Sequence, residues 1–243
     1  MENTSEKRLF QLDGRLAKCA AMLRGVPLAD IGTDHAYLPV YLAVRGEIPA
    51  AIAADLREGP LESAKRTIAR FHVESIVTAR LSDGLAAIQP QEAEDIVIAG
   101  MGGELIAQIL SKAPWLKAGG KRLVLQPMTT PEALRRFLRE NGFAVRREEA
   151  VAAGGKYYTV LCAEYDPAAV DTSDLYPYIG ALDGAAAENR GYLKTCLHRL
   201  EARIAGLSHA GRNAEAEEQK KLAAQIAARM KGEETDDDSR CNL

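Results

Sequence analysis

The sequence predicts an α/β protein in which a mostly parallel sheet is covered by helices and followed by a helical hairpin. Between residues 28 and 142, short apolar runs alternate with stretches of helical spacing, which is typical of parallel strands joined by crossover helices. Two strand-like runs then follow one another, joined by a short turn that contains Gly154 and Gly155, which predicts an antiparallel hairpin. From about residue 179, leucine and isoleucine recur every three or four residues, which predicts packed helices.

The composition is that of an ordinary globular protein. The chain has 243 residues, of which 47% are hydrophobic and 27% charged, so it has room for one domain and a small appendage. A net charge of −3 gives no overall positive field, so contact with nucleic acid depends on a local basic patch. The four cysteines form no CxxC pair, and no apolar run reaches the ~18 to 20 residues of a membrane helix. We therefore expect a cytoplasmic protein that binds neither metal nor membrane, and we expect a monomer.

The elements of the predicted sheet follow in order. Apolar residues at helical spacing predict a first helix over 8–23. Both faces of a parallel sheet are buried, so its strands read as continuous apolar runs, which lie at 28–32, 51–56, 77–83, 95–100 and 121–127. The intervening and following segments predict helices at 36–45, 59–71, 84–89, 103–113 and 131–142. The last of these has Pro131 in its first turn and Gly142 at its end, as helix termini prefer.

The remaining elements lie beyond Gly142. Strands at 143–151 and 156–164 form the predicted antiparallel hairpin. After a short linker, apolar residues recur at alternating intervals of four and three, which predicts the seam of a coiled coil at Leu193, Leu197, Leu200, Ile204 and Leu207. A polar loop with Gly206, Gly211 and Asn213 then precedes a second helix over about 214–231. We predict a sheet domain over 1–166, a helical hairpin over 167–231 and a disordered acidic tail over 232–243.

Acidic residues and glycines follow most of the predicted strands. Ligands of open parallel sheets bind beyond the carboxyl ends of the strands, so these residues are candidates for a site. Gly32 allows a tight turn after the first strand, and Asp55, 23 residues later, is suitably spaced to hold two ribose hydroxyls. Asp83 ends the third strand, where its carboxylate is able to accept from an adenine amino group. These strand ends predict a site for an adenosine and its tail.

The first turn, GTDHAY, indicates which adenosine cofactor this is. A dinucleotide site needs GxGxxG, because backbone N–H groups must approach a pyrophosphate, whereas Asp34 and His35 occupy that place here. An acidic side chain repels pyrophosphate and suits a cation. No GxxxxGK[ST] phosphate loop is present in the sequence either. The charge pattern therefore favours S-adenosylmethionine, with its cationic amino and sulfonium groups, over NAD or ATP.

Several segments together resemble the bacterial tRNA (adenine(22)-N(1))-methyltransferase family: RLAKCA (15–20), ADIGTDHAYLP (29–39), AADLREGPLESA (53–64), DGL (83–85), IAGMGGELI (98–106) and LQP (125–127). These class I enzymes methylate N1 of adenine 22 in the D-loop region of tRNA. The resemblance covers residues 9–165, and its specificity comes from DIGTDHAYLP and GMGG occurring together. It implies a Rossmann-like sheet that binds S-adenosylmethionine, tRNA as the partner, and a C-terminal coiled-coil domain that helps to hold the tRNA.

The resemblance also implies the roles of individual residues. It places the cofactor against Gly32, Asp34, Asp55, Leu56, Asp83, Gly84, Gly100, Met101 and Gly102. Asp34 and His35 are the candidate catalytic residues. The fourth strand lacks the Asn/Asp-Pro-Pro-aromatic block with which other methyltransferases hold an exocyclic amine. This fits a target such as adenine N1, which has a free lone pair and needs exposure and positioning more than a strong base.

Substrate contacts are expected from Arg15, Tyr37, Gln126 and Pro127. Structural roles remain open for these side chains and for the two candidate catalytic residues: Asp34 as a helix N-cap, His35 as a donor to a backbone carbonyl, Tyr37 as core, Gln126-Pro127 as a strand end and Arg15 on a solvated helix face.

Two basic groups are candidate RNA contacts, one formed by Arg135, Arg136, Arg139, Arg146 and Arg147, the other by Arg190, Lys194, Arg199 and Arg203. The rival functions are methylation of another RNA or a small molecule, and a non-catalytic binding module.

Overall fold

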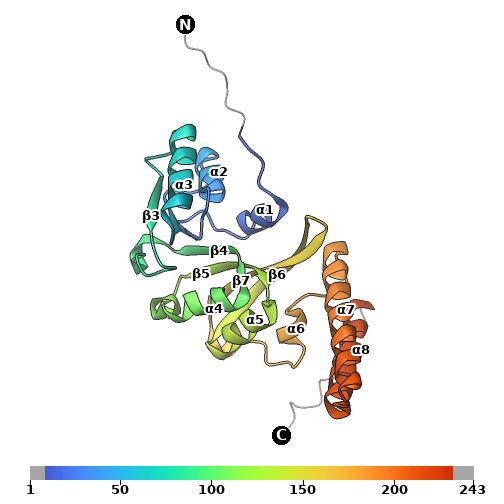
Figure 1. Ribbon diagram of the computed structural model, residues 1–243. Coiled ribbons are helices and arrows are strands. Elements are labelled where there is room, and N and C mark those ends of the chain that lie inside the picture. The colour runs from blue at the N-terminus through green and yellow to red at the C-terminus, as the bar shows by residue number, and fades with distance from the viewer. Residues whose placement is uncertain (1–8, 232–243) are drawn as a thin grey trace.

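The computed structural model describes residues 9–231, which form a seven-stranded sheet in the order β3-β2-β1-β4-β5-β7-β6 (Figure 1). The strands are β1 Leu28–Ile31, β2 Ala51–Asp55, β3 Val77–Leu81, β4 Asp95–Gly102, β5 Arg122–Thr129, β6 Phe143–Ala153 and β7 Lys156–Tyr165. The first five are parallel, and β7 runs antiparallel between β5 and β6. The predicted Rossmann-like sheet with one antiparallel hairpin strand is therefore confirmed.

Helices cover both faces of the sheet and continue beyond its edge (Figure 1). They are α1 Gly14–Ala20, α2 Tyr37–Val44, α3 Glu58–Phe71, α4 Gly103–Ser111, α5 Pro131–Glu140, α6 Tyr176–Ile179, α7 Ala187–His209 and α8 Asn213–Lys231. Strand residues alternate between two cores: Ile96 and Ile98 face α4 and α5, whereas Val97 faces α1, α2 and α3. All three side chains are fully buried, which explains why β4 reads as one continuous apolar run.

Some predicted boundaries are wrong, each for a local reason. No α-helix forms over 84–89, because Gly84 has a positive φ and the Ser82 hydroxyl accepts from Ala87 N, which closes a turn instead. The first helix is shorter than predicted within the described residues: Asp13 caps it by accepting from Arg15 N, and it ends at Ala20. Gly206 lies inside α7 and not in a loop, since one glycine costs only about 1 kcal/mol in a helix.

The helical hairpin packs against the antiparallel end of the sheet. Its core joins Leu193 and Leu200 of α7 to Leu222 and Ile226 of α8, with Ala150 of β6 completing the cluster. The predicted coiled-coil seam is buried mainly at its start, because the side chains after Leu200 are only half-buried. Within residues 9–231, no helix has the length and apolar character needed to cross a membrane. The acidic tail over 232–243 lies outside the described residues.

A buried ion pair attaches this hairpin to the sheet. The fully buried Arg135 of α5 donates to Glu148 Oε1 of β6 over 2.6 Å and to the Tyr192 hydroxyl of α7 over 3.1 Å. Arg135 Nη1 donates to the backbone oxygens of Pro177 and Tyr178, which belong to α6. Burial alone lowers an arginine pKa, yet the Glu148 carboxylate raises the pKa of Arg135 above its ordinary value. Arg135 therefore stays charged and links three helices to the sheet.

Candidate functional site

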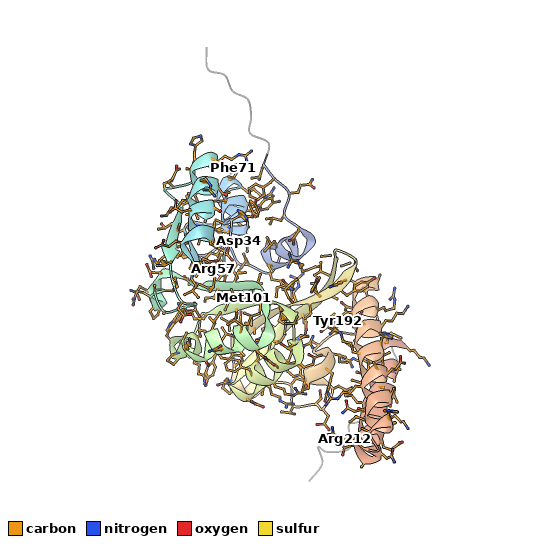
Figure 2. The ribbon with its side chains drawn as sticks, in the orientation of Figure 1. Asp34, Arg57, Phe71, Met101, Tyr192 and Arg212 are labelled. Carbon is orange, nitrogen blue, oxygen red and sulfur yellow. The ribbon has the colours of Figure 1, made fainter. Side chains whose placement is uncertain are left out.

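Two adjoining hollows open at the carboxyl ends of the parallel strands. The first hollow, of about 380 Å³, lies between the ends of β1, β2, β3 and β4, and the second, of about 370 Å³, lies between β1, β4, β5 and α1. Gly32, Asp34, Ala99 and Gly100 line both. Chain order reverses between β1 and β4, which is where ligands bind in open α/β sheets. In Figure 2, Asp34, Arg57 and Met101 lie close together in this region.

The turn after β1 has an unusual backbone. Gly32, Asp34 and Ala36 all have positive φ, at 74°, 52° and 56°, and the last two are not glycine. Non-glycine residues in this conformation carry strain that is found mostly at functional sites. The N-cap of α2 is Ala36, and no side chain caps this helix, so the N-cap role considered for Asp34 is not observed. The Asp34 side chain is instead 65% exposed beside both hollows.

His35 and Tyr37 form a flat surface in the second hollow. Their rings stack with centroids 5.0 Å apart and an interplanar angle of 15°. His35 Nε2 lies 3.5 Å from Asp34 Oδ2, which orients the imidazole toward a carboxylate. Tyr37 also packs against Phe10, with ring centroids 4.9 Å apart and the rings tilted by 56°, but is 42% exposed. Tyr37 is therefore not a core residue, and the stacked pair is available to a planar ligand.

The acids at the ends of β2 and β3 line the first hollow. Asp55 is buried, and its Oδ1 accepts from Arg57 N over 3.0 Å. Asp83 is exposed and lies 3.4 Å from Lys112 Nζ. Leu56 also lines this hollow and is 63% exposed. A buried carboxylate next to an exposed apolar side chain suits a ligand that has hydroxyl groups and a flat apolar ring.

Two glycines shape the floor shared by the hollows. A Cβ at Gly32 would lie 2.0 Å from Met101 Cε, so the flexible end of that side chain would have to move, and the φ of 74° strains any residue other than glycine. Gly100 has a φ of 82°, and open space surrounds the position of its missing Cβ. The strand was predicted to end at residue 100, but β4 continues to Gly102 through a register shift between Ala99 and Met101. Such a bulge bends the strand and leaves the Gly100 backbone facing both hollows.

Gln126 connects three parts of the second hollow. Its buried Oε1 accepts from Gly100 N over 3.1 Å and from Arg15 Nη1 over 3.4 Å. Arg15 is further held by Asp13, whose Oδ2 accepts from Arg15 Nη2 over 2.9 Å, and it lies over the Tyr158 ring. Arg15 is thus fixed at the edge of the second hollow and does not lie on a solvated helix face. Gln126 therefore positions Arg15 and Gly100 relative to one another.

Most of the predicted site residues are brought together. Gly32, Asp34, Asp55, Leu56, Asp83, Gly84, Gly100 and Met101 line the first hollow, and Arg15, His35, Tyr37 and Gln126 line the second. Gly102 and Pro127 line neither. Gly102 instead lets β4 approach the Thr129 hydroxyl, and Pro127 is buried within β5. Among residues 9–231, no three His, Cys, Asp or Glu side chains are grouped as potential metal ligands.

Sequence reasoning missed Asp30, an acid inside the apolar run of β1. Asp30 is buried on the wall of the second hollow, where its Oδ2 accepts from the Thr33 hydroxyl over 2.5 Å. Burial raises the pKa of Asp30 to about 6, the negative charge of Asp55 adds to the effect, and the bond from Thr33 opposes it. An acid within a run that is otherwise apolar was the available signal. The carboxylates of Asp30, Asp34 and Asp55 make the joined hollows suitable for a cation.

Known proteins resemble this chain over nearly its whole length. The model of the methyltransferase domain family matches residues 12–161, more than half of the chain. A tRNA (adenine(22)-N(1))-methyltransferase of Bacillus subtilis is 34% identical over 225 residues, covering 91% of this chain and 94% of the relative.

Solved structures agree with this relationship. The crystal structure of the B. subtilis m1A22 tRNA methyltransferase TrmK superposes with a TM-score of 0.73 at 32% identity, over 91% of this chain and 96% of that one. Streptococcus pneumoniae Sp1610 in complex with S-adenosyl-L-methionine superposes with a TM-score of 0.72 at 29% identity, over 87% and 97%. From the shared fold, the paired hollows and these likenesses, we conclude that the chain belongs to the tRNA (adenine(22)-N(1))-methyltransferase family.

Proposed function

We propose that this protein transfers a methyl group from S-adenosyl-L-methionine to N1 of adenine 22 of tRNA. The observation that carries the proposal is the pair of hollows that share Asp34 and Gly100 at the switch point of the sheet. One hollow offers groups for an adenosine, and the other is open to a substrate base. A relative with 34% identity is named for this reaction.

The residues of the first hollow fit S-adenosyl-L-methionine. The Asp55 carboxylate would accept from the two ribose hydroxyls, and Leu56 would pack on the adenine ring near Asp83 and Gly84. Gly32 lines this hollow beside Asp34 and Asp55, the acids that favour the cationic end of the cofactor. When bound, the cofactor supplies an electrophilic methyl group on a positively charged sulfur. We propose that Gly100 and Met101 form the floor beneath it.

The second hollow would position the target base. N1 of neutral adenine carries its own lone pair, so this chain needs to orient the base and has no proton to remove from N1. The His35–Tyr37 stack offers a flat surface for the base, and Asp34 offers a negative charge to the cationic methylated product. Arg15 and Gln126 define the opposite wall. We propose Asp34 and His35 as catalytic residues and Tyr37, Arg15 and Gln126 as the substrate side.

A single substitution tests the cofactor site. Asp55→Ala removes the carboxylate proposed to bind the ribose, so we expect the affinity for S-adenosyl-L-methionine to fall by about tenfold to hundredfold, or roughly 1.4 to 2.8 kcal/mol. Isothermal titration calorimetry measures this change. Glu58→Ala is the matched control, because this exposed acid of α3 lines neither hollow. Wild-type affinity in Asp55→Ala would show that the cofactor does not bind there.

Transfer of labelled methyl groups tests the substrate. We expect label from S-adenosyl-L-methionine to enter tRNA, and we expect a tRNA with guanine at position 22 to accept none. Label at another position, in another RNA or in a small molecule would support the rival methyltransferase functions. Cofactor binding without transfer to any of these would support a non-catalytic binding module.

The substrate indicates where the reaction takes place. We infer that the protein acts in the cytoplasm, where tRNA is the available partner, and we propose that it acts as a monomer. We also propose that residues 1–166 are the catalytic part and 167–231 an accessory helical part. Light scattering coupled to size exclusion measures the assembly state, and a mass near 53 kDa, twice the 26.3 kDa of the chain, would contradict the monomer.

A further inference from the structure

A third cavity lies between α5 and the helical hairpin, outside the two hollows. It encloses about 310 Å³, and its charged and aromatic lining is formed by Glu104, Glu132, Arg136, Tyr178, Arg199 and Arg203. Glu104 is in the first turn of α4, directly after the strand that forms the floor of the site, and Thr130 at the cavity wall directly follows β5. The third cavity therefore opens on the same edge of the sheet as the two hollows. The proposed methyl transfer uses none of its residues.

The arginines of this cavity differ from most others in the protein. Arg15, Arg80 and Arg122 are each paired with a carboxylate, at distances between 2.7 and 2.9 Å. Within residues 9–231, Arg199 and Arg203 form no ion pair or hydrogen bond, although the charge of Arg203 helps Arg212 to lower the pKa of Glu215. Arg136 lies over the face of the Tyr178 ring, 5.5 Å from its centroid. Three guanidinium groups from two separate elements thus meet around one cavity without a carboxylate bound to any of them.

The structure also separates these arginines from their neighbours in sequence. Arg135 is buried in its ion pair, Arg146 and Arg147 pair with Asp166 and Glu149, and Arg190 donates to backbone oxygens. The two basic groups identified in the sequence therefore contribute different members to one place, Arg136 from the first group and Arg199 and Arg203 from the second. Residues 199 and 203 are four apart on α7, so their side chains share one face of the helix.

The chemistry of the cavity matches a nucleotide. Guanidinium groups bind phosphate oxygens, often through two parallel hydrogen bonds. The Tyr178 ring, with the planar Arg136 group over one face, offers a surface on which a base is able to stack. The carboxylates of Glu104 and Glu132 accept hydrogen bonds only, and so favour a base that presents N–H groups. The cavity volume is close to the 380 Å³ of the hollow proposed to hold an adenosyl cofactor.

We propose that this third cavity binds one unpaired nucleotide of the RNA substrate, distinct from the adenine that is methylated. Arg199 and Arg203 bind its phosphate, and its base enters between Tyr178 and the two glutamates. This contact holds the RNA at a second point on the edge of the sheet, and thereby places the target base at the second hollow. The inference rests on the proposed tRNA methylation, and it adds a subsite for that substrate.

Removal of charge tests the phosphate contact. We expect Arg199→Ala/Arg203→Ala to raise the KM for tRNA at least tenfold near physiological salt, with an unchanged kcat at saturating tRNA and unchanged affinity for S-adenosyl-L-methionine. Each lost phosphate contact reduces the slope of log affinity against log salt by about 0.7 to 0.9. Arg199 and Arg203 bind the same phosphate in this proposal, so the double variant should lose one such contact and its slope should change by that amount. Lys156→Ala is the control, since this exposed residue of β7 lies outside the cavity and belongs to neither basic group. We expect Lys156→Ala to behave as the wild type.

A larger side chain that fills the third cavity tests whether a base enters it. Ala133 lines the cavity and is half-buried, so Ala133→Phe fills the cavity without changing its charge. We expect a KM for tRNA raised at least fivefold and a salt slope equal to that of the wild type. Circular dichroism and cofactor affinity show that the variant is folded. If Ala133→Phe folds and has the wild-type KM, no nucleotide enters the cavity and the inference is wrong.

Different results would contradict the proposed function and the nucleotide site. If the wild type binds S-adenosyl-L-methionine but does not methylate tRNA, the proposed function is wrong. If the wild type methylates tRNA while the double arginine variant keeps the KM and salt slope of Lys156→Ala, the proposed function stands and the nucleotide site is overturned. A raised KM in both the arginine variant and Ala133→Phe, with cofactor affinity intact, supports the site.

Discussion

Asp30 shows how a single buried carboxyl group differs from its exposed neighbour Asp34. Asp30 sits inside β1, almost completely removed from water, and its pKa is about 6. Asp34, four residues later, is held at a positive φ and points its carboxylate into solvent beside both hollows. An aspartate side chain therefore costs folding free energy at position 30, whereas at position 34 it is available to a ligand. The depth of each residue in the sheet decides the difference.

This difference predicts a pH dependence of stability. The pKa of Asp30 rises from its ordinary 3.8 in the unfolded chain to about 6, so the folded protein binds more protons than the unfolded one between pH ~4 and ~6. The free energy of unfolding must then fall as pH rises through this window, by at most about 3 kcal/mol from this group. Asp30→Asn removes the titration, so it should stabilise the protein more at pH 7.5 than at pH 4.5.

Urea unfolding of both proteins at the two pH values measures this effect. The comparison uses the difference between variant and wild type, which cancels the contribution of other acids such as Glu92, whose pKa is lowered to about 2 by its bond to Arg80. An equal difference at pH 4.5 and pH 7.5 would show that Asp30 does not titrate in this range.

At the scale of elements, the junction between α5, β6 and α7 depends on polar contacts as well as apolar packing. Glu148 of β6 accepts from Arg135, from the Thr159 hydroxyl over 2.7 Å and from Ala181 N over 3.1 Å. The carboxylate therefore joins α5, β7 and the chain after α6. Close backbone approach contributes too, since a Cβ at Gly191 would lie 2.2 Å from the Tyr157 ring. The position of α7 against the sheet, and so the shape of the third cavity, follows from these contacts.

We expect Glu148→Ala to lower the free energy of unfolding by about 3 to 5 kcal/mol, because it leaves the Arg135 guanidinium buried without a counter-charge. The double variant Arg135→Met/Glu148→Leu should lose less than this, since it removes both charges together. Asp166→Ala, which breaks the exposed pair with Arg146, is the control and should cost less than about 1 kcal/mol. Denaturant unfolding measures all three. A double variant less stable than Glu148→Ala would contradict this account.

At the scale of the whole molecule, the proposed catalytic and accessory parts share one interior. Ala150 of the sheet is buried in the same apolar cluster as Leu193 and Ile226 of the hairpin, and Arg135 reaches Tyr192 across the boundary. Figure 1 shows α7 and α8 lying along the edge of the sheet that β6 and β7 form, away from α2 and α3. Unfolding the hairpin alone would expose this cluster and leave Arg135 with fewer partners.

We therefore expect a single cooperative unfolding transition in scanning calorimetry, with equal calorimetric and van't Hoff enthalpies. Saturation with S-adenosyl-L-methionine at 100 times its Kd should move this whole transition upward, because binding to the folded state contributes about 2.7 kcal/mol. No residue of α7 lines either hollow. If the unfolding of the helical hairpin also moves to higher temperature when the cofactor binds, the hairpin and the cofactor site are therefore coupled. Two transitions, with only the first shifted by the cofactor, would contradict a shared interior.

The candidate site was predictable in part, for a physical reason. Gly32, Asp55 and Asp83 follow strands, and the carboxyl ends of parallel strands meet at one edge whatever the details of packing. Contacts between segments that are distant in the chain leave no such pattern in the sequence. Arg15, Gly100 and Gln126 lie far apart in sequence, and their hydrogen bonds depend on how α1 and the β4 bulge pack against β5. Gly102 and Pro127 have suitable sequence positions but point elsewhere for the same reason.

By itself, the sequence determined the alternation of strands and helices, the antiparallel hairpin and the acids at the edge of the sheet. Such features depend on residues close in the chain, through hydrophobic periodicity and turn chemistry. Only the tertiary structure decided that Arg135 is buried in an ion pair while Arg136, beside it, joins Arg199 and Arg203 around a cavity. Neighbouring residues on a helix face different directions, and which direction meets protein or solvent is set by the packing of distant elements.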